Sequence, residues 1–408
     1  MRFVLAINPR FPARGMRTVA ASISAGLLSV AAPAPAVAAT ADTAGPADTA
    51  ITADTAAFIA RELSATGTNL MPSVVDTPDV GLSIDAVFAL DALGGQQAQA
   101  DATYDAIKQE ADAFIHAGSE TDAGRLAKIV ALRASRNDVD ASLLQELVAA
   151  VGADGALRGV GATDTVYNFS QAWAVIALSR SGEATAAARA AQFLLHQQCE
   201  SGAIPLSAAT PPNCAQENTD TTALLIQAVS LTHPEDPHLQ SATQFLRAKQ
   251  GADGGLASEQ LPVNANTTGL AAGAFAVTRD QEGFHRAHSY LSSLRFDASA
   301  PASLKGAFAW SRSQTSAPSG PTDQIRRASV QAAIGFAGAN YANANKVDLP
   351  QAVPTTAAPS TSERPTPSHT NESGSSGGGI AIIVAGIIGL LIALGLGSGG
   401  LAGLLGTL

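Results

Sequence analysis

Between residues 54 and 345, apolar stretches recur along the chain, and each follows a short polar residue. Ser, Asp and Asn favour the position before a helix, because their side chains accept hydrogen bonds from its first free N–H groups. The clearest copies are DTTALLIQA at 220–228 and NTTGLAAGA at 266–274. We predict six buried helices, beginning near Ser83, Asp122, Ser170, Asp220, Asn266 and Asp323.

A second, more polar set of helices alternates with the first. Residues 143–151, 186–198 and 239–250 carry apolar residues three and four positions apart, which is typical of a helix with one buried face. A turn follows each one, at 154–157, 201–204 and 253–256, and contains the glycine that helix ends favour. No β-strand pattern of useful length is present, so the sequence predicts an all-α protein.

Six pairs of one apolar and one amphipathic helix are best accommodated in a closed ring. We therefore predict an α/α toroid over residues 54–347, with the apolar helices lining the axis and the amphipathic helices covering them. An open solenoid of helix pairs remains the alternative, because end repeats of a solenoid diverge and the first and last units here do so.

Composition supports a packed helical domain. Hydrophobic residues make up 46% of the chain and charged residues only 14%, which excludes disorder for most of its length. The net charge of −10 comes without a basic stripe, so nucleic acid is excluded as a partner.

The N-terminal region resembles a secretory signal. Arg10, Arg14 and Arg17 precede an apolar segment at 19–30 and a possible Ala-x-Ala cleavage site at 36–38. We predict a signal peptide at 1–38, followed by a disordered Thr/Ala/Asp-rich leader at 39–53.

The C-terminal region predicts a tether. Residues 348–379 are rich in Pro, Ser, Thr and Gly and should form an extended linker. The following segment, 380–400, is apolar, uncharged and long enough to span a bilayer, and a short tail at 401–408 follows it. The sequence thus predicts a single-pass bacterial cell-membrane protein whose main domain is extracellular, although no basic residue follows the span.

The two cysteines, Cys199 and Cys214, lie fifteen positions apart in a chain predicted to be exported. A disulfide is the natural interpretation, because no nearby His or Cys-x-x-Cys pattern activates either thiol.

Several turns resemble a known superfamily. Residues 250–256 (QGADGGL) are similar to the Gln-x-x-Asp-Gly-Gly turn of prenyltransferase and squalene-cyclase repeats, and residues 198–204 (QCESGAI) are a looser copy. Residues 219–223 and 267–271 resemble inner-helix starts of the intrinsic factor and transcobalamin barrel. The resemblance covers roughly 54–345 and implies the toroid. Only the comparison with corrinoid carriers implies a ligand of that class.

The family's active-site motifs are missing. Residues 138–141 (DVDA) lack the last acid of the Asp-x-Asp-Asp motif of terpene cyclases, and no third cysteine is present to complete a zinc site of the prenyltransferase type. The thioester motif and the C-terminal β-domain of corrinoid carriers are also absent. We therefore expect neither catalytic residues nor a metal or other cofactor.

Polar and aromatic residues near the inner-helix starts should gather at one mouth of the ring. Helix N-termini offer free N–H donors and partial positive charge. At each position the alternative role is to cap a helix or to fill the core. His285 and His288 share a helix face, but we interpret them as a solvated surface pair. The candidate ligand-binding residues are Asp122, Tyr167, Asn168, Trp173, Asp220, Thr221, Asn266, Thr267 and Asp323.

These features predict a membrane-anchored extracytoplasmic toroid that binds a small molecule or a cell-envelope partner without catalysis. Two alternatives remain open. One is an enzyme, either a terpenoid or prenyl-group transformer or a glycan-active hydrolase that uses carboxylates such as Asp122 and Asp220. The other is a structural envelope protein.

Overall fold

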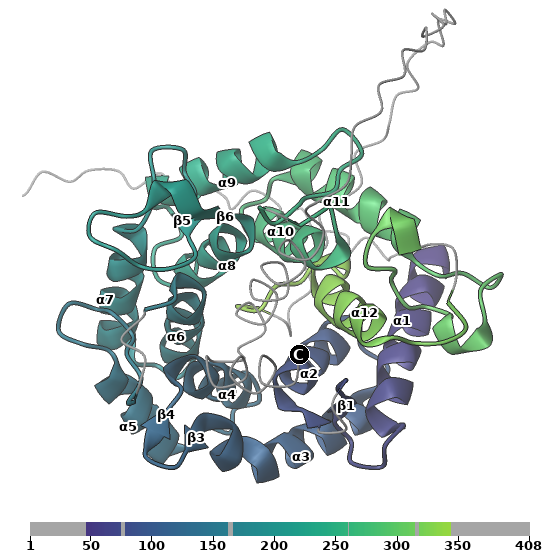
Figure 1. Ribbon diagram of the computed structural model, residues 1–408, viewed down its shortest axis with the longest axis horizontal. Helices are drawn as coiled ribbons and strands as arrows, with labels where there is room; N and C mark the ends of the chain where they lie inside the picture. Colours follow the sequence, from purple (N-terminus) through teal and green to yellow (C-terminus); the bar gives the residue numbers. More distant parts are fainter. Residues whose placement is uncertain (1–45, 75–77, 162–165, 260, 315–317, 344–408) are drawn as a thin grey trace, which may run out of the picture. The chain divides into compact units, whose positions relative to one another are not determined.

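The computed structural model describes residues 46–74, 78–161, 166–259, 261–314 and 318–343. Six inner helices surround an axis and six outer helices cover them (Figure 1). The inner helices are α2 (Val80–Leu93), α4 (Ala123–Ser135), α6 (Asn168–Arg180), α8 (Thr219–Val229), α10 (Ala265–Val277) and α12 (Asp323–Phe336). The outer helices are α1 (Pro46–Ser64), α3 (Gln97–Ile115), α5 (Ala141–Ala150), α7 (Ala184–Leu195), α9 (Pro237–Lys249) and α11 (Gln281–Leu294).

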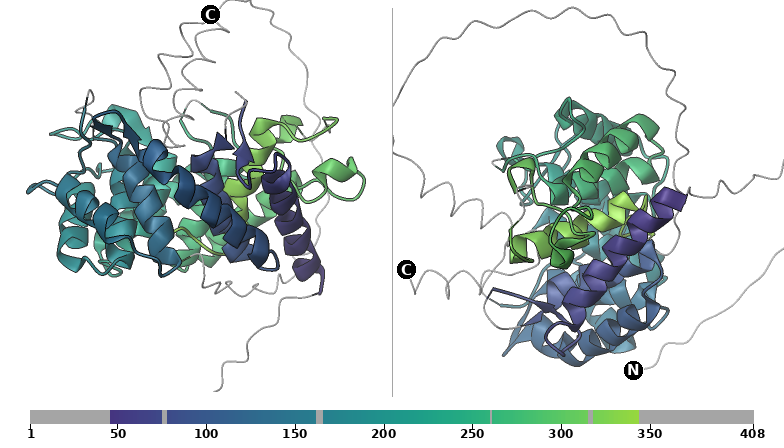
Figure 2. Two further views of the ribbon diagram at one scale, coloured as in Figure 1. Left: turned by 90° about the horizontal axis from the view of Figure 1, so that it is seen from below. Right: turned by 90° about the vertical axis from the view of Figure 1, so that its right-hand side faces the viewer.

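The ring is closed. Each inner helix contacts the next, and α12 packs on α2, so the last inner helix meets the first (Figures 1 and 2). The predicted α/α toroid is confirmed, and an open solenoid is excluded because its end repeats would not meet.

Inner and outer helices differ in how they are buried. The inner helix α6 has ten of its thirteen residues buried, from Asn168 to Leu178 with one exception. The outer helix α7 buries residues three and four apart, such as Ala187, Ala190 and Ala191, and leaves its other face wet. This pair therefore hides a helix buried on nearly every side behind an amphipathic one, as the sequence pattern predicted.

Strands are minor within the described residues. Three antiparallel two-residue pairs join outer to inner helices: β1 (Met71–Pro72) with β2 (Pro78–Asp79), β3 (His116–Ala117) with β4 (Glu120–Thr121), and β5 (Ile204–Pro205) with β6 (Glu217–Asn218). Short 3-10 turns lie at Cys214–Gln216, Ala302–Leu304 and Arg312–Gln314.

The glycine turns connect neighbouring repeats. Gly254 has φ +89°, and a Cβ added there would lie 2.0 Å from the carbonyl oxygen of Arg286 on α11. Gln250, at the end of α9, donates from Nε2 to the carbonyls of Gly254 (3.0 Å) and Gly283 (2.9 Å). The Gln and Gly of the QGADGGL turn therefore bind one outer helix to the next.

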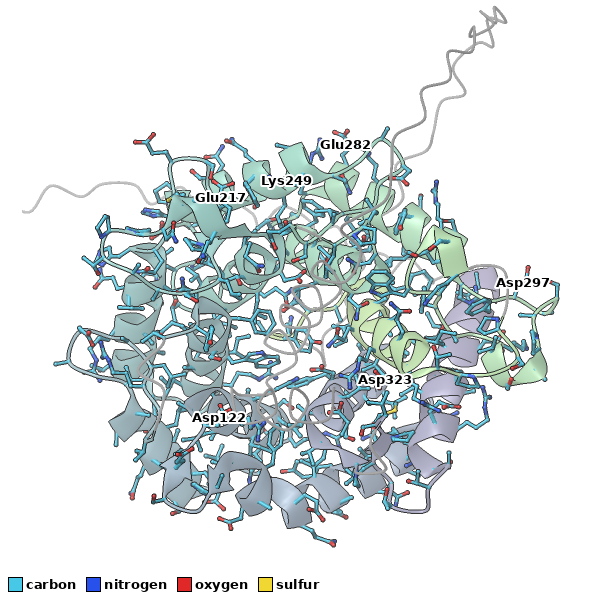
Figure 3. All side chains as sticks on the ribbon, viewed as in Figure 1. Asp122, Glu217, Lys249, Glu282, Asp297 and Asp323 are labelled. Carbon is cyan, nitrogen blue, oxygen red and sulfur yellow. A yellow bond between two sulfur atoms is a disulfide. The ribbon has the colours of Figure 1, made fainter. Side chains whose placement is uncertain are left out.

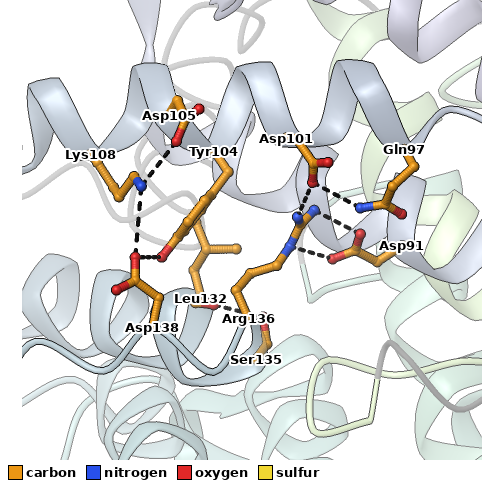
Figure 4. Close-up of polar contacts among 10 residues, drawn as sticks. All are labelled: Asp91, Gln97, Asp101, Tyr104, Asp105, Lys108, Leu132, Ser135, Arg136 and Asp138. Atoms are coloured by element: carbon orange, nitrogen blue, oxygen red, sulfur yellow. Dashed lines mark hydrogen bonds and ion pairs between the residues drawn. The ribbon is translucent and has the colours of Figure 1, made fainter.

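A charged cluster ties the first two helix pairs together (Figure 4). Arg136, which ends α4, donates from Nη2 to Asp91 of α2 at 2.8 Å and from Nη1 to Asp101 of α3 at 2.6 Å. The pKa of Asp91 is raised by burial, which the positive charge of Arg136 opposes. The guanidinium thus compensates a carboxylate that is otherwise removed from water.

The disulfide between Cys199 and Cys214 is confirmed, with a Cα–Cα distance of 5.8 Å. It closes the loop that carries β5 on the α7 side of the ring.

The predicted signal peptide (1–38), linker (348–379), membrane segment (380–400) and tail (401–408) lie outside the described residues, as does most of the leader (39–53). The part of the leader that is described, residues 46–53, belongs to helix α1 rather than to a disordered segment. Among the described residues, no helix combines the length and apolar character that a bilayer span requires.

Candidate functional site

Five of the six inner helices have their N-cap one to four residues before the predicted start, and the start at Asp122 is confirmed. Asp122 caps α4 as expected, accepting a hydrogen bond from the N–H of Arg125 at 3.0 Å. The caps of α8 and α10 are Asn218 and Asn264, each two residues before the predicted one. Asp220 and Asn266 therefore do not cap their helices, and each is the second residue of its helix.

Most other candidates have structural partners. Thr221 donates to its cap Asn218 at 2.7 Å, and Asn168 donates from Nδ2 to the carbonyl of Pro205 at 2.9 Å. Tyr167 precedes α6 but makes no side-chain cap bond. Trp173 is only 3% exposed and lies in an aromatic cluster inside the ring. Asp122 pairs with Arg125 at 3.3 Å instead of joining Asp220.

Asp323 takes part in the contact that closes the ring. It lies in the first turn of α12, close to where that helix packs on α2 (Figure 3). Its Oδ2 accepts from Nε of Arg327 at 2.7 Å, while Nη2 of Arg327 reaches the α2 cap Asp79 at 2.5 Å. Burial disfavours the charged guanidinium, but the two carboxylates outweigh it and raise the pKa of Arg327.

A belt of polar side chains continues from this contact around the inside of the ring. Nδ2 of Asn266 donates to Oε1 of Gln331 at 2.6 Å, and Nε2 of Gln331 donates to Asp85 at 3.1 Å. Asp85 in turn pairs with Lys128 at 2.8 Å, and both side chains are at most 5% exposed. Helices α10, α12, α2 and α4 are thus linked through their axis-facing polar groups.

Asp85 and Lys128 occupy equivalent places in the repeat. Each is the sixth residue of its inner helix, and so is Trp173 in α6. The sixth residues of α8, α10 and α12 are apolar: Leu224, Leu270 and Ala328. The axis is therefore polar and aromatic on one half of this layer and apolar on the other.

Asp220 extends the polar surface to α8. Burial raises the pKa of its carboxyl, and contacts with the hydroxyls of Thr267 and Ser258 only partly oppose that rise. The Oδ1 atom of Asp220 is buried and has no partner within the described residues. The structure thus brings the candidates Asp220 and Thr267 into contact.

Glu259 is a neighbouring acid that sequence reasoning missed. It lies in the loop before α10, with φ +37°, and accepts from Nδ2 of Asn218 (2.6 Å), the N–H of Thr219 (2.8 Å) and Oγ of Ser258 (2.7 Å). The residue is exposed in part, yet burial of the carboxylate and then the charge of Asp220 raise its pKa. No periodic pattern marks a loop residue of this kind.

Unpartnered oxygens mark this part of the ring. Besides Asp220, the Oδ1 atoms of Asn266 and Asp323 are buried without a hydrogen-bond partner among the described residues, as is that of Asn168 at the start of α6, and Asn266 is only 9% exposed. Burying a polar atom without a partner costs free energy. These three acceptors lie near the starts of the consecutive inner helices α8, α10 and α12.

The histidine pair differs from expectation. His288 is partly buried and stacks on Phe336 of α12, with ring centroids 4.5 Å apart, and His285 contacts Phe284. His288 therefore helps to pack α11 on α12, and both histidines are partly buried rather than forming a solvated pair. Within the described ranges, no group of three or more His, Cys, Asp and Glu side chains is placed to hold a metal ion.

No protein-family model matches the sequence, and no curated protein matches it. Solved structures do. An α-amylase from Clostridium perfringens is 13% identical, with a TM-score of 0.55 over 72% of this chain and 99% of that one. An inactive variant of an α-1,6-mannanase from Salegentibacter, in complex with α-1,6-mannotriose, is 13% identical, with a TM-score of 0.52 over 71% and 99%.

The ent-copalyl diphosphate synthase of Streptomyces platensis is 18% identical, with a TM-score of 0.47 over 68% of this chain. The chain spans about half (54%) of that synthase, and this likeness carries no argument. At such identities the comparisons define the class of the protein by its fold, which is an α/α toroid. Enzymes are prominent among the proteins that share it.

Proposed function

We propose that the protein binds a small, hydroxyl-rich ligand at the inner-helix starts of α8, α10 and α12, without transforming it. The observation that carries this proposal is the set of buried, unpartnered Oδ1 atoms on Asp220, Asn266 and Asp323. These oxygens accept hydrogen bonds, so their natural complement is a ligand rich in O–H donors. A carbohydrate is such a ligand.

The membrane anchor, the extracellular location and the cell-envelope partner remain part of this proposal on sequence grounds alone. Residues 380–400 would hold the ring near the membrane through the linker at 348–379. No cofactor is required by this activity, and the corrinoid analogy gains no support from the polar belt.

Binding can be tested with two soluble probes, maltotriose and α-1,6-mannotriose, added to the full chain in detergent. At a hundredfold excess over the dissociation constant, a ligand should raise the melting temperature by about 5 °C. Asn266→Ala and Asp220→Asn should abolish this rise.

Asp140→Asn, which makes the same change at the cap of the outer helix α5 and keeps an oxygen that can cap it, is the matched control and should retain the rise. If neither sugar raises the melting temperature, the proposal of a hydroxyl-rich ligand is wrong. If all variants show the same rise, the assignment of the site to Asp220 and Asn266 is wrong.

A second function, glycoside hydrolysis, is favoured by one observation. The hydroxyl of Ser258 contacts both Asp220 and Glu259, which limits their separation to roughly two hydrogen-bond lengths, about 6 Å. Burial favours the protonated form of Asp220, as a proton donor requires, and Glu259 could serve as the second carboxylate. Shorter sugars released from either probe by the wild type, but not by Asp220→Asn, would establish hydrolysis in place of simple binding.

A further inference from the structure

The chain does not leave the ring at the end of α12. Residues 337–343 turn into the axis, where Figure 1 shows the yellow-green trace inside the circle of inner helices. Ala339 is fully buried, and Asn340 and Tyr341 are each 5% exposed. This segment, which we call the plug, fills the ring from within.

Tyr341 is the centre of the plug. Its ring lies edge-on to Trp173 of α6 at 4.8 Å between centroids and edge-on to Phe88 of α2 at 5.5 Å. Burial, and then the charge and hydrogen bond of Asp85, keep the pKa of the phenol well above its usual value. The phenol is therefore a neutral donor to Asp85, whose further partners are Lys128 and Gln331.

The pocket around Tyr341 has the chemistry of a binding site. Trp173 and Phe88 supply two aromatic faces, Asp85 supplies an acceptor, and Lys128 lies 5.4 Å from the Trp173 ring centroid. Edge-to-face contacts hold a ring in a defined orientation, and a buried carboxylate selects a hydroxyl on it. We call these four side chains the cage.

Backbone hydrogen bonds to the last turn of α12 hold residues 337–339, whereas side chains from other helices hold the backbone of Tyr341 and Ala342. The N–H of Tyr341 donates to Oε1 of Gln227 at 2.9 Å, and Gln227 is fixed by the carbonyl of Leu270 at 2.9 Å. Nη1 of Arg180 donates to the carbonyl of Ala342. Isolated bonds of this kind lack the cooperativity of a helix, so the plug should open at lower free energy than the helices around it.

Two groups beside the plug are incompletely satisfied. Oδ1 of Asn340 and Nε of Arg180 are buried without a partner in the described part of the chain. An unsatisfied buried group adds to the cost of the closed state and is relieved when water reaches it.

We propose that the cage is a binding site for a hydroxylated ring, that Tyr341 occupies it as an internal ligand, and that withdrawal of residues 337–343 opens it. The proposal does not rest on the proposed function, since the cage lies deeper than Asp220 and is filled by the chain itself. It assigns an autoinhibitory role to the plug. The expected ligand is a hydroxylated ring, because the tyrosine side chain that occupies the cage is one.

A crosslink can hold the plug in place. A Cβ built at Gly273 lies 3.3 Å from Cβ of Asn340, close to the spacing that a disulfide needs. We would combine Gly273→Cys and Asn340→Cys in a Trp310→Phe background, so that Trp173 is the only tryptophan. Gly273→Ser with Asn340→Ser is the matched control, with similar bulk and no bond.

Acrylamide quenching of Trp173 fluorescence reports the opening. The serine control should show a quenching constant at least about twofold higher than that of the crosslinked protein, because only its plug withdraws. Equal constants in the two proteins would overturn the plug as a moving element.

Hydrogen exchange on the unaltered full chain tests the same proposal without substitutions. The Tyr341 amide should exchange at least about tenfold faster than amides in the middle of α6, and p-cresol should accelerate it further by competing for the cage. Exchange at the rate of the α6 amides would overturn the withdrawal. A rate that p-cresol leaves unchanged would overturn the ligand class.

Discussion

At Asp220, a carboxylate lies in the first turn of an inner helix with one oxygen enclosed and unpaired. Its raised pKa means that the folded protein binds this proton more tightly than the unfolded chain does. Stability from this group is therefore present below about pH 4 and is lost as the pH rises towards the folded pKa. The charged form of Asp220 lowers the unfolding free energy at neutral pH, which is consistent with a residue that serves ligand binding rather than stability.

The substitution Asp220→Asn should remove this loss of stability with rising pH. Relative to the wild type, the variant should gain unfolding free energy above about pH 4, by up to about 1.4 kcal/mol per pH unit across the window. Urea denaturation at a series of pH values measures the difference. Asp154→Asn is the control of opposite sign, because Arg158 lowers the pKa of Asp154 to about 2. A difference for Asp220→Asn that does not change with pH would contradict the assignment.

At the scale of single elements, the glycine turns show what fixes one repeat against the next. Gly254 and Gly182 have similar φ values, +89° and +83°, but differ in their surroundings. The space beside Gly182 is open, whereas Gly254 lies against the backbone of α11. The same backbone conformation therefore serves a helix end in one case and a contact between helices in the other.

Replacing each of these glycines by alanine separates the two roles. Gly182→Ala should cost about 1 kcal/mol of unfolding free energy, the penalty of a left-handed residue with a side chain. Gly254→Ala should cost about 3 kcal/mol or more, because its Cβ would also collide with a carbonyl oxygen. Urea denaturation of the two variants should show this order, and equal costs would mean that the close approach is unimportant.

The elements were predictable from the sequence to a greater extent than the site. Apolar stretches predicted the inner helices, because burial on every side leaves a continuous run of small and aliphatic residues. The caps other than Asp122 were misplaced: Asn218 and Asp220, for example, are equally good caps by residue type, and only tertiary packing distinguishes them. Tyr341 and Glu259 lie outside the repeated helices, where no periodicity indicates what a side chain contacts.

At the scale of the whole molecule, the ring closes on a buried ion pair. Arg327 of α12 and Asp79 at the start of α2 are separated by 248 positions, and both side chains are at most 8% exposed. Such a pair stabilises only while both partners are present, because either one alone is a buried charge.

Arg327→Met should therefore cost about 3–5 kcal/mol of unfolding free energy, since it leaves Asp79 uncompensated. The matched control is Arg158→Met, which removes a pair whose side chains are about half exposed and should cost less than about 1 kcal/mol. Urea denaturation at neutral pH compares the two variants. A small cost for Arg327→Met would mean that other contacts between α2 and α12 close the ring unaided.

Closure between α2 and α12 also means that no helix pair is geometrically the first. Each pair packs against two neighbours, so the architecture itself does not set which pair comes first in the chain. Around such a circle, a binding surface can move from one pair to the next by substitution alone. We interpret the two unlike halves of the axis as the result of such substitutions. One half carries Asp85, Lys128 and Trp173, and the other carries Leu224, Leu270 and Ala328 at the equivalent positions.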